Sequence, residues 1–255
     1  MKQEILHSIR TAEKKQIAVL LDPDKTTLAE LPNVCAHIAQ AEPDYLFVGG
    51  STVTDSIDLF VRRLKEELNI PVVLFPGNAS QFSPVADAML YLSLISGRNA
   101  ELLIGQQVKS ALCIHQSGIE TIPTGYMLID GGRQSTTEKV SQTTPIARTD
   151  IHTAVSTALA GELLGQKLIY LEAGSGALQS VPTEMISEVK RHLSIPLVVG
   201  GGIRSEEQIC EILRAGADLI VIGNYFETKP EEMKRFCEVV EKITSEPTVS
   251  VANGR

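Results

Sequence analysis

The sequence lacks any run of about 18 apolar residues, which is the length that a membrane-spanning helix needs. It also lacks the apolar segment of a secretory signal, because its N-terminus, MKQEILHSIR, carries charges throughout. We therefore expect a cytoplasmic protein without a membrane span. Peripheral contact with a membrane surface stays open.

Cysteine is scarce, with four residues in a chain of 255, and no two of them show the CxxC spacing of a zinc site. A disulfide framework is equally unexpected with so few cysteines in a chain of this length. Each cysteine lies in an apolar stretch, so we expect buried free thiols. The four are Cys35, Cys113, Cys210 and Cys237.

Basic residues are also in deficit, because 23 lysines and arginines face 31 acidic residues, which gives a net charge of −8. Nonspecific affinity for nucleic acids comes from basic side chains that neutralise phosphates, so we expect no nucleic-acid partner. An anionic small molecule is still possible as a substrate, provided that local groups hold it.

The residues that are present repeat one pattern, in which a short apolar run is followed by a turn and an amphipathic segment. The runs are continuous rather than alternating, as expected for parallel strands buried on both faces. Eight runs with helices between them predict an α/β fold, a (βα)8 TIM barrel that forms a single domain over residues 1–255. We expect residues 245–255 to be a frayed tail. The runs cover residues 17–21, 45–48, 72–75, 89–94, 125–129, 168–171, 197–199 and 219–222.

An internal repeat supports the barrel. Residues 69–77, NIPVVLFPG, resemble residues 194–202, SIPLVVGGG, at an offset of 125 residues, about half the chain. A half-barrel repeat would make the third strand equivalent to the seventh. Chance similarity between two strand starts is the alternative.

One unit of the barrel is incomplete. Residues 76–88, between the third and fourth runs, contain glycine and proline and show no helical period. We therefore predict a modified barrel in which the regular helix after strand 3 is missing. A long polar loop, residues 131–149, should lie over the C-terminal face, where barrel active sites form.

Glycines follow the last three predicted strands. Gly174 and Gly176 follow the sixth strand, Gly201 and Gly202 the seventh, and Gly223 the eighth. Glycine lets backbone N–H groups approach an anion closely, and glycine-rich turns here form the usual phosphate site of this fold. The alternative is that these glycines only make tight turns. This explanation would have to apply after each of three adjoining strands.

Polar side chains follow the first two strands. Asp22 and Ser51 could together hold Mg²⁺ that carries the phosphates of a substrate, because such sites need few protein oxygens. The alternative is structural, since Asp22 could make an Asx turn before Pro23, and Ser51 could start the next helix.

An acidic residue ends the sixth strand. Glu172 lies beside the predicted phosphate loop, where a carboxylate could orient a substrate hydroxyl or take its proton. Tyr170 is two residues earlier and therefore on the same face of the strand. Filling of the barrel interior is the alternative for Tyr170.

These motifs together resemble the geranylgeranylglyceryl phosphate synthase family, which includes the heptaprenylglyceryl phosphate synthases. YLEAGSG is the most specific of them, and the resemblance runs from about residue 17 to residue 224. Leu20 stands where one branch of the family has lysine, so the chain resembles the larger, typically geranylgeranyl-specific group. The motifs are LLDPDK (20–25), VGGS (48–51), VLFPGN (73–78), YLEAGSGA (170–177), VGGGIRS (199–205) and ADLIVIGN (217–224).

The resemblance implies a Mg²⁺-dependent prenyltransferase. Such an enzyme transfers a polyprenyl group from its diphosphate to the sn-3 hydroxyl of sn-glycerol 1-phosphate, which forms the ether bond of archaeal-type lipids. It implies Mg²⁺ at Asp22 and Ser51, and Glu172 and Tyr170 as the catalytic residues. The implied substrate-binding residues are Tyr170, Leu171, Glu172, Ala173, Gly174, Ser175, Gly176, Gly201, Gly202, Gly223 and Asn224.

The prenyl tail should enter an apolar groove at the missing helix. Phe75, Phe82, Val85 and Met89 are candidates for its walls. We also expect a homo-oligomer.

Two other classes stay open at this point. One is a barrel enzyme that acts on a small sugar phosphate, although no lysine for a Schiff base lies inside a strand run. The other is a barrel that binds a phosphorylated ligand without catalysis, which would not need Asp22, Ser51 and Glu172.

Overall fold

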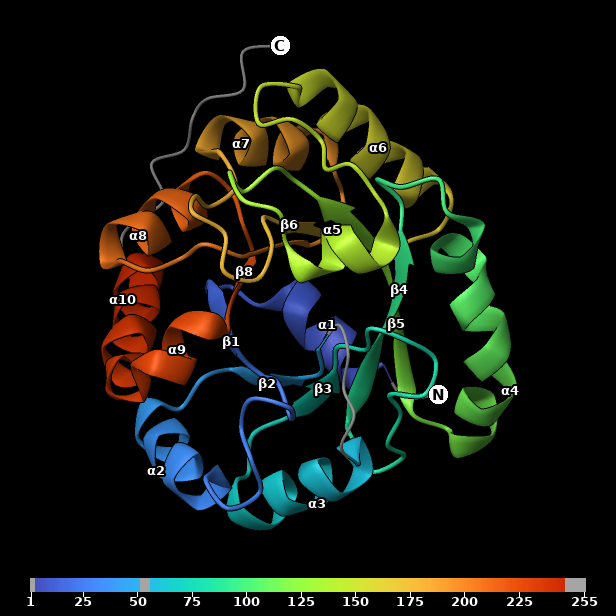
Figure 1. The fold of residues 1–255 in the computed structure, drawn as a ribbon. Helices are drawn as coiled ribbons and strands as arrows, with labels where there is room; N and C mark the ends of the chain where they lie inside the picture. The colour runs from blue at the N-terminus through green and yellow to red at the C-terminus, as the bar shows by residue number, and fades with distance from the viewer. Residues whose placement is uncertain (1–2, 51–55, 246–255) are drawn as a thin grey trace.

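Eight parallel strands close into a barrel in the order of the sequence, β1 to β8 and back to β1 (Figure 1). The structure is a computed structural model that describes residues 3–50 and 56–245. The single barrel spans these residues, while the tail predicted at 245–255 lies almost wholly outside them. The strands are β1 (Gln16–Leu21), β2 (Tyr45–Val48), β3 (Val72–Leu74), β4 (Ala88–Leu94), β5 (Glu120–Leu128), β6 (Leu168–Glu172), β7 (Leu197–Gly200) and β8 (Leu219–Ile222).

Helices surround the barrel and close one of its ends. Within the described residues, none of them has the length and apolar character to cross a membrane. The α-helices are α1 (Glu4–Thr11), α2 (Leu31–Ala41), α3 (Ile57–Glu67), α4 (Gln106–Ser117), α5 (Thr136–Ser141), α6 (Ile151–Leu163), α7 (Thr183–His192), α8 (Glu206–Arg214), α9 (Asn224–Thr228) and α10 (Met233–Ser245). A π-helix, η1 (Glu101–Gly105), precedes α4, and a 3₁₀ helix, η2 (Pro230–Glu232), precedes α10.

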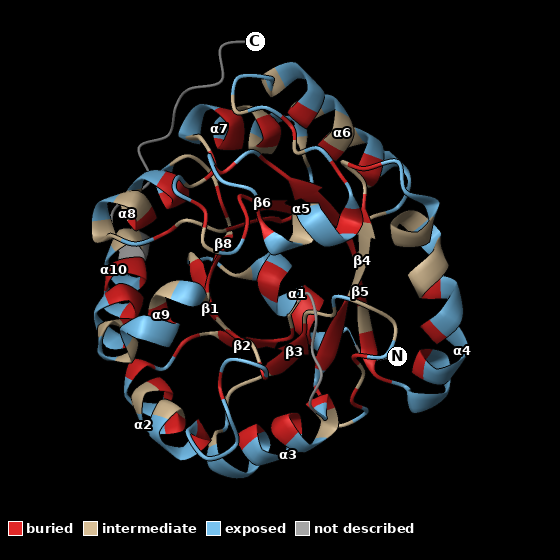
Figure 2. Ribbon diagram, viewed as in Figure 1, coloured by how far each residue is buried: buried red, intermediate tan, exposed pale blue. Residues whose placement is uncertain are grey.

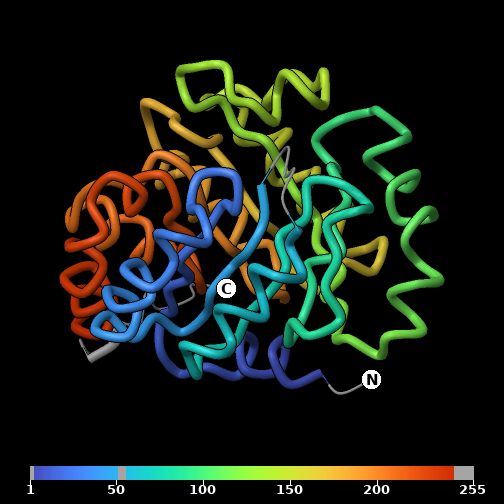
Figure 3. The backbone as a smooth tube through the Cα atoms, turned by 60° about the horizontal axis from the view of Figure 1, so that its bottom comes forward, coloured from blue at the N-terminus to red at the C-terminus, as the bar shows by residue number. Residues whose placement is uncertain are grey.

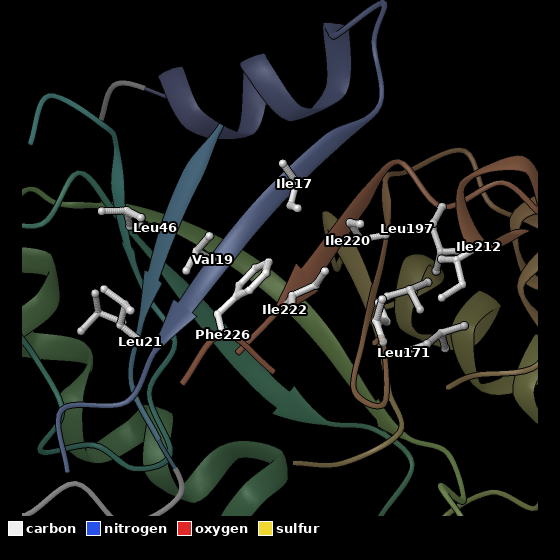
Figure 4. Packing of buried hydrophobic residues seen from close by; sticks show 14 of the residues in the cluster. Ile17, Val19, Leu21, Leu46, Leu171, Leu197, Ile212, Ile220, Ile222 and Phe226 are labelled. Atoms are coloured by element: carbon white, nitrogen blue, oxygen red, sulfur yellow. The ribbon is translucent and has the colours of Figure 1, made fainter. Parts of the chain in front are cut away.

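The core has two layers, as the continuous apolar runs of the strands require. One side of each strand faces the barrel interior, and the other packs against the inner faces of the helices, which are buried in Figure 2. Figure 4 shows part of the outer layer, where Ile17 and Val19 of β1 lie near Ile220 and Ile222 of β8. Each strand therefore contributes to both layers.

Helix α1 closes the end of the barrel where the strands begin. The buried carboxylate of Glu120, the first residue of β5, accepts hydrogen bonds from the backbone N–H groups of Ile5 and Leu6 at 2.9 and 2.8 Å. Because these N–H groups have no partner within the helix, the contact caps α1 against the barrel. The opposite end, where the strands finish, is left for the functional site.

The predicted half-barrel repeat agrees with the strand starts. Val72 begins β3 and Leu197 begins β7, 125 residues apart. The N–H of Val72 donates to the carboxylate of Asp87 at 2.8 Å, and the N–H of Leu197 donates to that of Asp218 at 2.7 Å. Each aspartate directly precedes the next strand, so the same contact fixes the start of both equivalent strands.

The missing helix after β3 is confirmed, because residues 75–87 contain no helix. The predicted strand boundaries are close to the observed ones except at β5, which begins at Glu120 rather than at 125. Its first residues pair with β4 only, and pairing with β6 begins at Thr124. This one-sided pairing tolerates Pro123 inside the strand, because proline has no N–H to donate.

Two other expectations need correction. The polar loop 131–149 contains a short helix, α5, whose capping box pairs Ser135 with Glu138. Cys113 is exposed on α4 and Cys210 is half-buried, so only Cys35 and Cys237 are buried thiols. In both cases the local composition does not determine how the segment packs against its neighbours.

Candidate active site

A pocket lies at the carboxyl ends of the strands, on the opposite side of the barrel from α1. Figure 3 shows the barrel from the side, with α1 along the bottom and the loop that carries α5 at the top. Residues that follow β1, β2, β3, β6, β7 and β8 all line this pocket. The convergence is a property of the parallel barrel, which brings all strand ends to one face.

Glu172 is a buried acid at the floor of the pocket. It ends β6 and is 6% exposed. Burial raises the pKa of its carboxyl from 4.5 to about 7, although the N–H of Gly174, 2.7 Å from Oε1, and the nearby Tyr170 hydroxyl favour the ionised form. A carboxyl with a pKa near neutrality can accept and return a proton under physiological conditions.

Tyr170 stands beside this acid inside the barrel. A Cβ atom placed on Gly200 would lie 2.3 Å from Tyr170 Oη and 2.9 Å from Glu172 Oε2, so glycine at that position leaves room for both groups. The Tyr170 hydroxyl is buried close to the carboxyl of Glu172, but it makes no well-formed hydrogen bond to any described residue. A buried polar group without a partner is costly, so this hydroxyl is ready to bind a ligand atom.

Aromatic rings pack around Tyr170 and form the side of the pocket that borders the interior of the barrel. The ring centroid of Tyr170 is 5.4 Å from that of Phe75 and 5.3 Å from that of Tyr126. Tyr126 lies on β5 and also lines the pocket. The sequence pattern does not distinguish this residue, because one tyrosine within an apolar strand resembles a core residue.

The glycine loops after β6 and β7 touch each other. A Cβ atom on Gly201 would lie 2.4 Å from Glu172 Oε1 and 2.7 Å from the backbone nitrogen of Gly174. Gly201 also has a φ of +83°, which other residues rarely adopt. The close approach requires glycine, and it brings the backbone of both loops next to the carboxyl of Glu172.

These loops line the pocket, and several of their backbone N–H groups are without a partner in the described part of the chain. Among the described residues, none accepts a hydrogen bond from the N–H of Ser175, Gly176, Gly201 or Gly202. The hydroxyl of Ser175 donates to Oδ1 of Asn224 at 2.7 Å and so connects the loop after β6 to the loop after β8. Several free N–H groups in neighbouring loops of one pocket can form a site for an anion such as phosphate.

Asp22 lies on the other side of the pocket, after β1. Its Oδ1 accepts from the N–H of Asp24 at 3.1 Å, so the structural alternative, an Asx turn, is present. The same carboxyl lines the pocket and is half-buried, and burial raises its pKa above the usual value. A Cβ on Gly50 would lie 2.8 Å from it, so the carboxyl sits against the end of β2. Asp22 can therefore both form the Asx turn and serve as a ligand of a metal ion.

The predicted partner of Asp22, Ser51, lies outside the described residues. In the described part of the chain, no group of three or more histidine, cysteine, aspartate or glutamate residues could enclose a metal ion. One carboxylate at a pocket edge fits a different kind of site, in which Mg²⁺ keeps most of its coordination for water and substrate phosphates. The carboxylate of Asp22, the described member of the predicted pair, is a donor of the kind that such a site needs.

An apolar arm of the pocket runs along β4. Residues from both faces of this strand line it, among them Leu90 and Tyr91. Its outer wall is the segment formed by η1 and α4, which contributes Leu102, Gln107 and Ser110. The hydroxyl of Tyr91 donates to the carbonyl of Gln107 at 2.9 Å and holds this wall against the strand. Residues 76–79, from the segment after β3 that lacks a helix, also line the pocket.

The structure places most of the predicted site residues along this pocket, but not all of them. Leu171 and Ala173 belong to the outer packing layer, so only their backbone could reach a ligand. Phe75 and Met89 line the apolar arm, whereas Phe82 and Val85 pack against the outer core and are wrong as wall residues. The prediction missed the η1 and α4 residues, whose sequence carries no mark of a groove. The residues found at the pocket are Asp22, Tyr170, Glu172, Gly174, Ser175, Gly176, Gly201, Gly202, Gly223 and Asn224.

Comparison with known proteins places the chain in a family. The model of the PcrB family matches residues 9–242. A protein of Chitinophaga pinensis named geranylgeranylglyceryl phosphate synthase is 48% identical over 227 residues, which are 89% of this chain and 90% of the relative. A protein of Methanosphaera stadtmanae with the same name is 41% identical over 233 residues, 91% of this chain and 95% of the relative.

Solved structures agree in fold. The structure of (S)-3-O-geranylgeranylglyceryl phosphate synthase from Thermoplasma acidophilum, in complex with the substrate sn-glycerol-1-phosphate, is 34% identical with a TM-score of 0.87 and covers 94% of this chain and 97% of its own. The Thermoplasma volcanium enzyme is 37% identical, with a TM-score of 0.86, and covers 95% and 98%. The chain therefore belongs to the PcrB family, together with the proteins named geranylgeranylglyceryl phosphate synthase.

Proposed function

We propose that this protein is a Mg²⁺-dependent prenyltransferase. It transfers a geranylgeranyl group from geranylgeranyl diphosphate to the sn-3 hydroxyl of sn-glycerol 1-phosphate. The observation that carries the proposal is the buried carboxyl of Glu172, with a pKa of about 7, directly beside the free N–H groups of two glycine loops. The carboxyl can bind a hydroxyl group, and the N–H groups can bind a phosphate. Together they would recognise an acceptor that is an alcohol with a phosphate group.

The acceptor is held at two points. Its phosphate lies against the loops after β6, β7 and β8, where backbone dipoles compensate for the acidic character of the chain. Its hydroxyl lies within reach of Glu172 and of the unpartnered hydroxyl of Tyr170. Fixing both ends of a small molecule positions one oxygen for attack and lowers the entropic part of the barrier.

The reaction exchanges one carbon–oxygen bond for another. The bond between the allylic C1 of the donor and its diphosphate oxygen breaks, and the diphosphate leaves with the electron pair. The acceptor oxygen forms a bond to C1, and its proton passes to the carboxylate of Glu172. The aromatic wall of Phe75, Tyr126 and Tyr170 keeps water away from the allylic carbon, which water would otherwise trap.

The donor lies between Asp22 and the apolar arm. Mg²⁺, held by Asp22 and Ser51, would neutralise charge on the diphosphate as it leaves. The prenyl tail extends along β4, where apolar side chains of the strand and of the η1–α4 wall exclude water from it. Burial of a long tail contributes about 0.8 kcal/mol per methylene at most, which favours donors that fill the arm.

A product assay tests the proposal. Purified protein is incubated with sn-glycerol 1-phosphate, Mg²⁺ and geranyl, farnesyl, geranylgeranyl or heptaprenyl diphosphate, and the ether product is identified by mass spectrometry. We expect product with geranylgeranyl diphosphate, and little with sn-glycerol 3-phosphate, with glycerol or with a chelator present. Absence of an ether product with every donor would contradict the proposal and favour a different phosphate-binding barrel.

A further inference from the structure

The pocket contains more acid than base. Among the charged residues that line it, Asp22, Glu172 and Glu227 are acidic, and Lys25 and Arg204 are basic. A diphosphate adds several negative charges to this surface. The acidic groups oppose its binding, so the position of the two cations decides where a diphosphate can lie.

Arg204 already makes hydrogen bonds within the protein. Its guanidinium donates to the carbonyl oxygens of Ala177 and, at 3.5 Å, of Leu178 in the loop after β6. These contacts hold two loops together on the acceptor side of the pocket. Moving the arginine toward a ligand would break both of them.

Lys25 is placed differently. Its Nζ lies 3.0 Å from Oε1 of Glu227 on α9 and 3.8 Å from Oδ2 of Asp22. Its side chain is 39% exposed, and the residue follows β1 by only four positions. The ammonium group therefore stands at the mouth of the pocket, next to the carboxyl assigned to the metal ion.

We propose that Lys25 binds the diphosphate of the prenyl donor and that Glu227 holds its ammonium group in place until the donor arrives. This inference rests on the proposed function. On binding, the ammonium group exchanges the carboxylate of Glu227 for a phosphate oxygen, and no covalent bond forms or breaks. When the allylic bond ionises, the same contact stabilises the charge that develops on the leaving group.

The exchange is energetically easy because the ion pair is partly exposed to solvent. Solvent weakens the attraction within such a pair, so releasing Glu227 costs little free energy. A hydrogen bond from an ammonium group to a phosphate is stronger, because both groups are charged and a diphosphate carries several negative charges. Lys25 is also long and flexible enough to follow the diphosphate as it departs.

Binding of inorganic diphosphate in the presence of Mg²⁺ tests the assignment without turnover. Isothermal titration calorimetry compares the wild type with Lys25→Met, Lys25→Arg and Glu227→Gln. We expect Lys25→Met to weaken binding at least about tenfold, Lys25→Arg to weaken it less, and Glu227→Gln to strengthen it a few-fold. Lys229→Met is the matched control, because Lys229 lies next to α9, contacts the ring of Tyr225 and does not line the pocket.

Steady-state kinetics give a second readout. In Lys25→Met, kcat/KM for the donor should fall at least about tenfold, while the KM for sn-glycerol 1-phosphate stays unchanged. Unchanged affinity of Lys25→Met for diphosphate, or an effect confined to the acceptor KM, would overturn the assignment. If Lys25→Met does not fold, unchanged affinity in Glu227→Gln overturns it instead. If Lys25→Met binds diphosphate more weakly but the wild type makes no ether product, the result would support the role of Lys25 in diphosphate binding and refute the proposed function.

Discussion

At the scale of single residues, the proposed site depends on one buried carboxyl that lies in the pocket, that of Glu172. Burial of Glu172 raises its pKa to about 7, and a glycine at position 200 leaves room for both this carboxyl and the hydroxyl of Tyr170. The carboxyl can accept a proton only at pH values at which it is ionised. Its titration should therefore be visible in both activity and stability.

Replacement of Glu172 by glutamine should lower kcat by about 10²- to 10⁴-fold, because it removes the group that we propose as the acceptor of the hydroxyl proton. In the wild type, kcat/KM for the acceptor should rise with pH around a midpoint near 7, where the carboxyl ionises. Initial rates across pH 5.5–9 check both expectations. Near-normal turnover of Glu172→Gln, with an intact circular dichroism spectrum, would rule out the assigned role.

The same substitution should alter how stability depends on pH. The pKa of Glu172 is raised in the folded state, so the folded protein binds this proton more tightly, and stability is lost as pH rises from about 4.5 to about 7. Glu172→Gln escapes this loss, which amounts to about 3 kcal/mol at most. Denaturant unfolding at pH 5 and pH 8 measures the free energy of unfolding of both proteins. The difference, variant minus wild type, should be larger at pH 8 than at pH 5. The exposed Glu231→Gln serves as the control, and an equal difference at both pH values would argue against the raised pKa.

The phosphate loops offer a test that spares the fold. A side chain at Gly202 would not probe the phosphate cleanly, because its Cβ would lie 2.7 Å from the backbone of Gln179 and its φ is +70°. Ser175→Ala removes only the hydrogen bond to Asn224. We expect the acceptor KM to rise about 2- to 12-fold, with the donor KM unchanged. Ser180→Ala, in the same loop but outside the pocket, is the control, and a change confined to the donor KM would contradict the assignment.

At the scale of elements, the segment that replaces a regular barrel unit matters most. Because residues 75–87 form no helix, the η1–α4 segment becomes the outer wall of the apolar arm. The segment begins as a π-helix, which is rare in proteins and often occurs at functional sites. Its inner residues should decide which tails fit.

Ser110 on α4 allows a direct test of the groove. It is buried and lines the arm, so Ser110→Phe should narrow it. Long donors should lose more than short ones, and the ratio of kcat/KM for geranylgeranyl to geranyl diphosphate should fall about tenfold or more. Leu112→Phe, on the exposed face of the same helix, is the matched control. If both variants leave the ratio unchanged, the tail does not follow this arm.

At the scale of the whole molecule, the sequence predicts the barrel well because burial on both faces leaves a continuous apolar run for each strand. Convergence of the strand ends then predicts Asp22, Glu172 and the glycine loops. The contact between Lys25 and Glu227 could not be predicted, since it joins side chains 202 residues apart that only the closed barrel brings together. The groove wall was missed for the same reason, because helix docking decides which side of α4 faces β4.

The continuity of the pocket has a consequence for the reaction cycle. The glycine loops and the apolar arm are parts of one cavity, and an ether-linked product would carry both the phosphate of the acceptor and the tail of the donor. It would occupy both ends at once, whereas each substrate engages only part of the cavity. Its departure must break all of these contacts together. Release of the product would then limit turnover, and a bilayer or a detergent micelle that takes up the amphiphilic product would raise kcat.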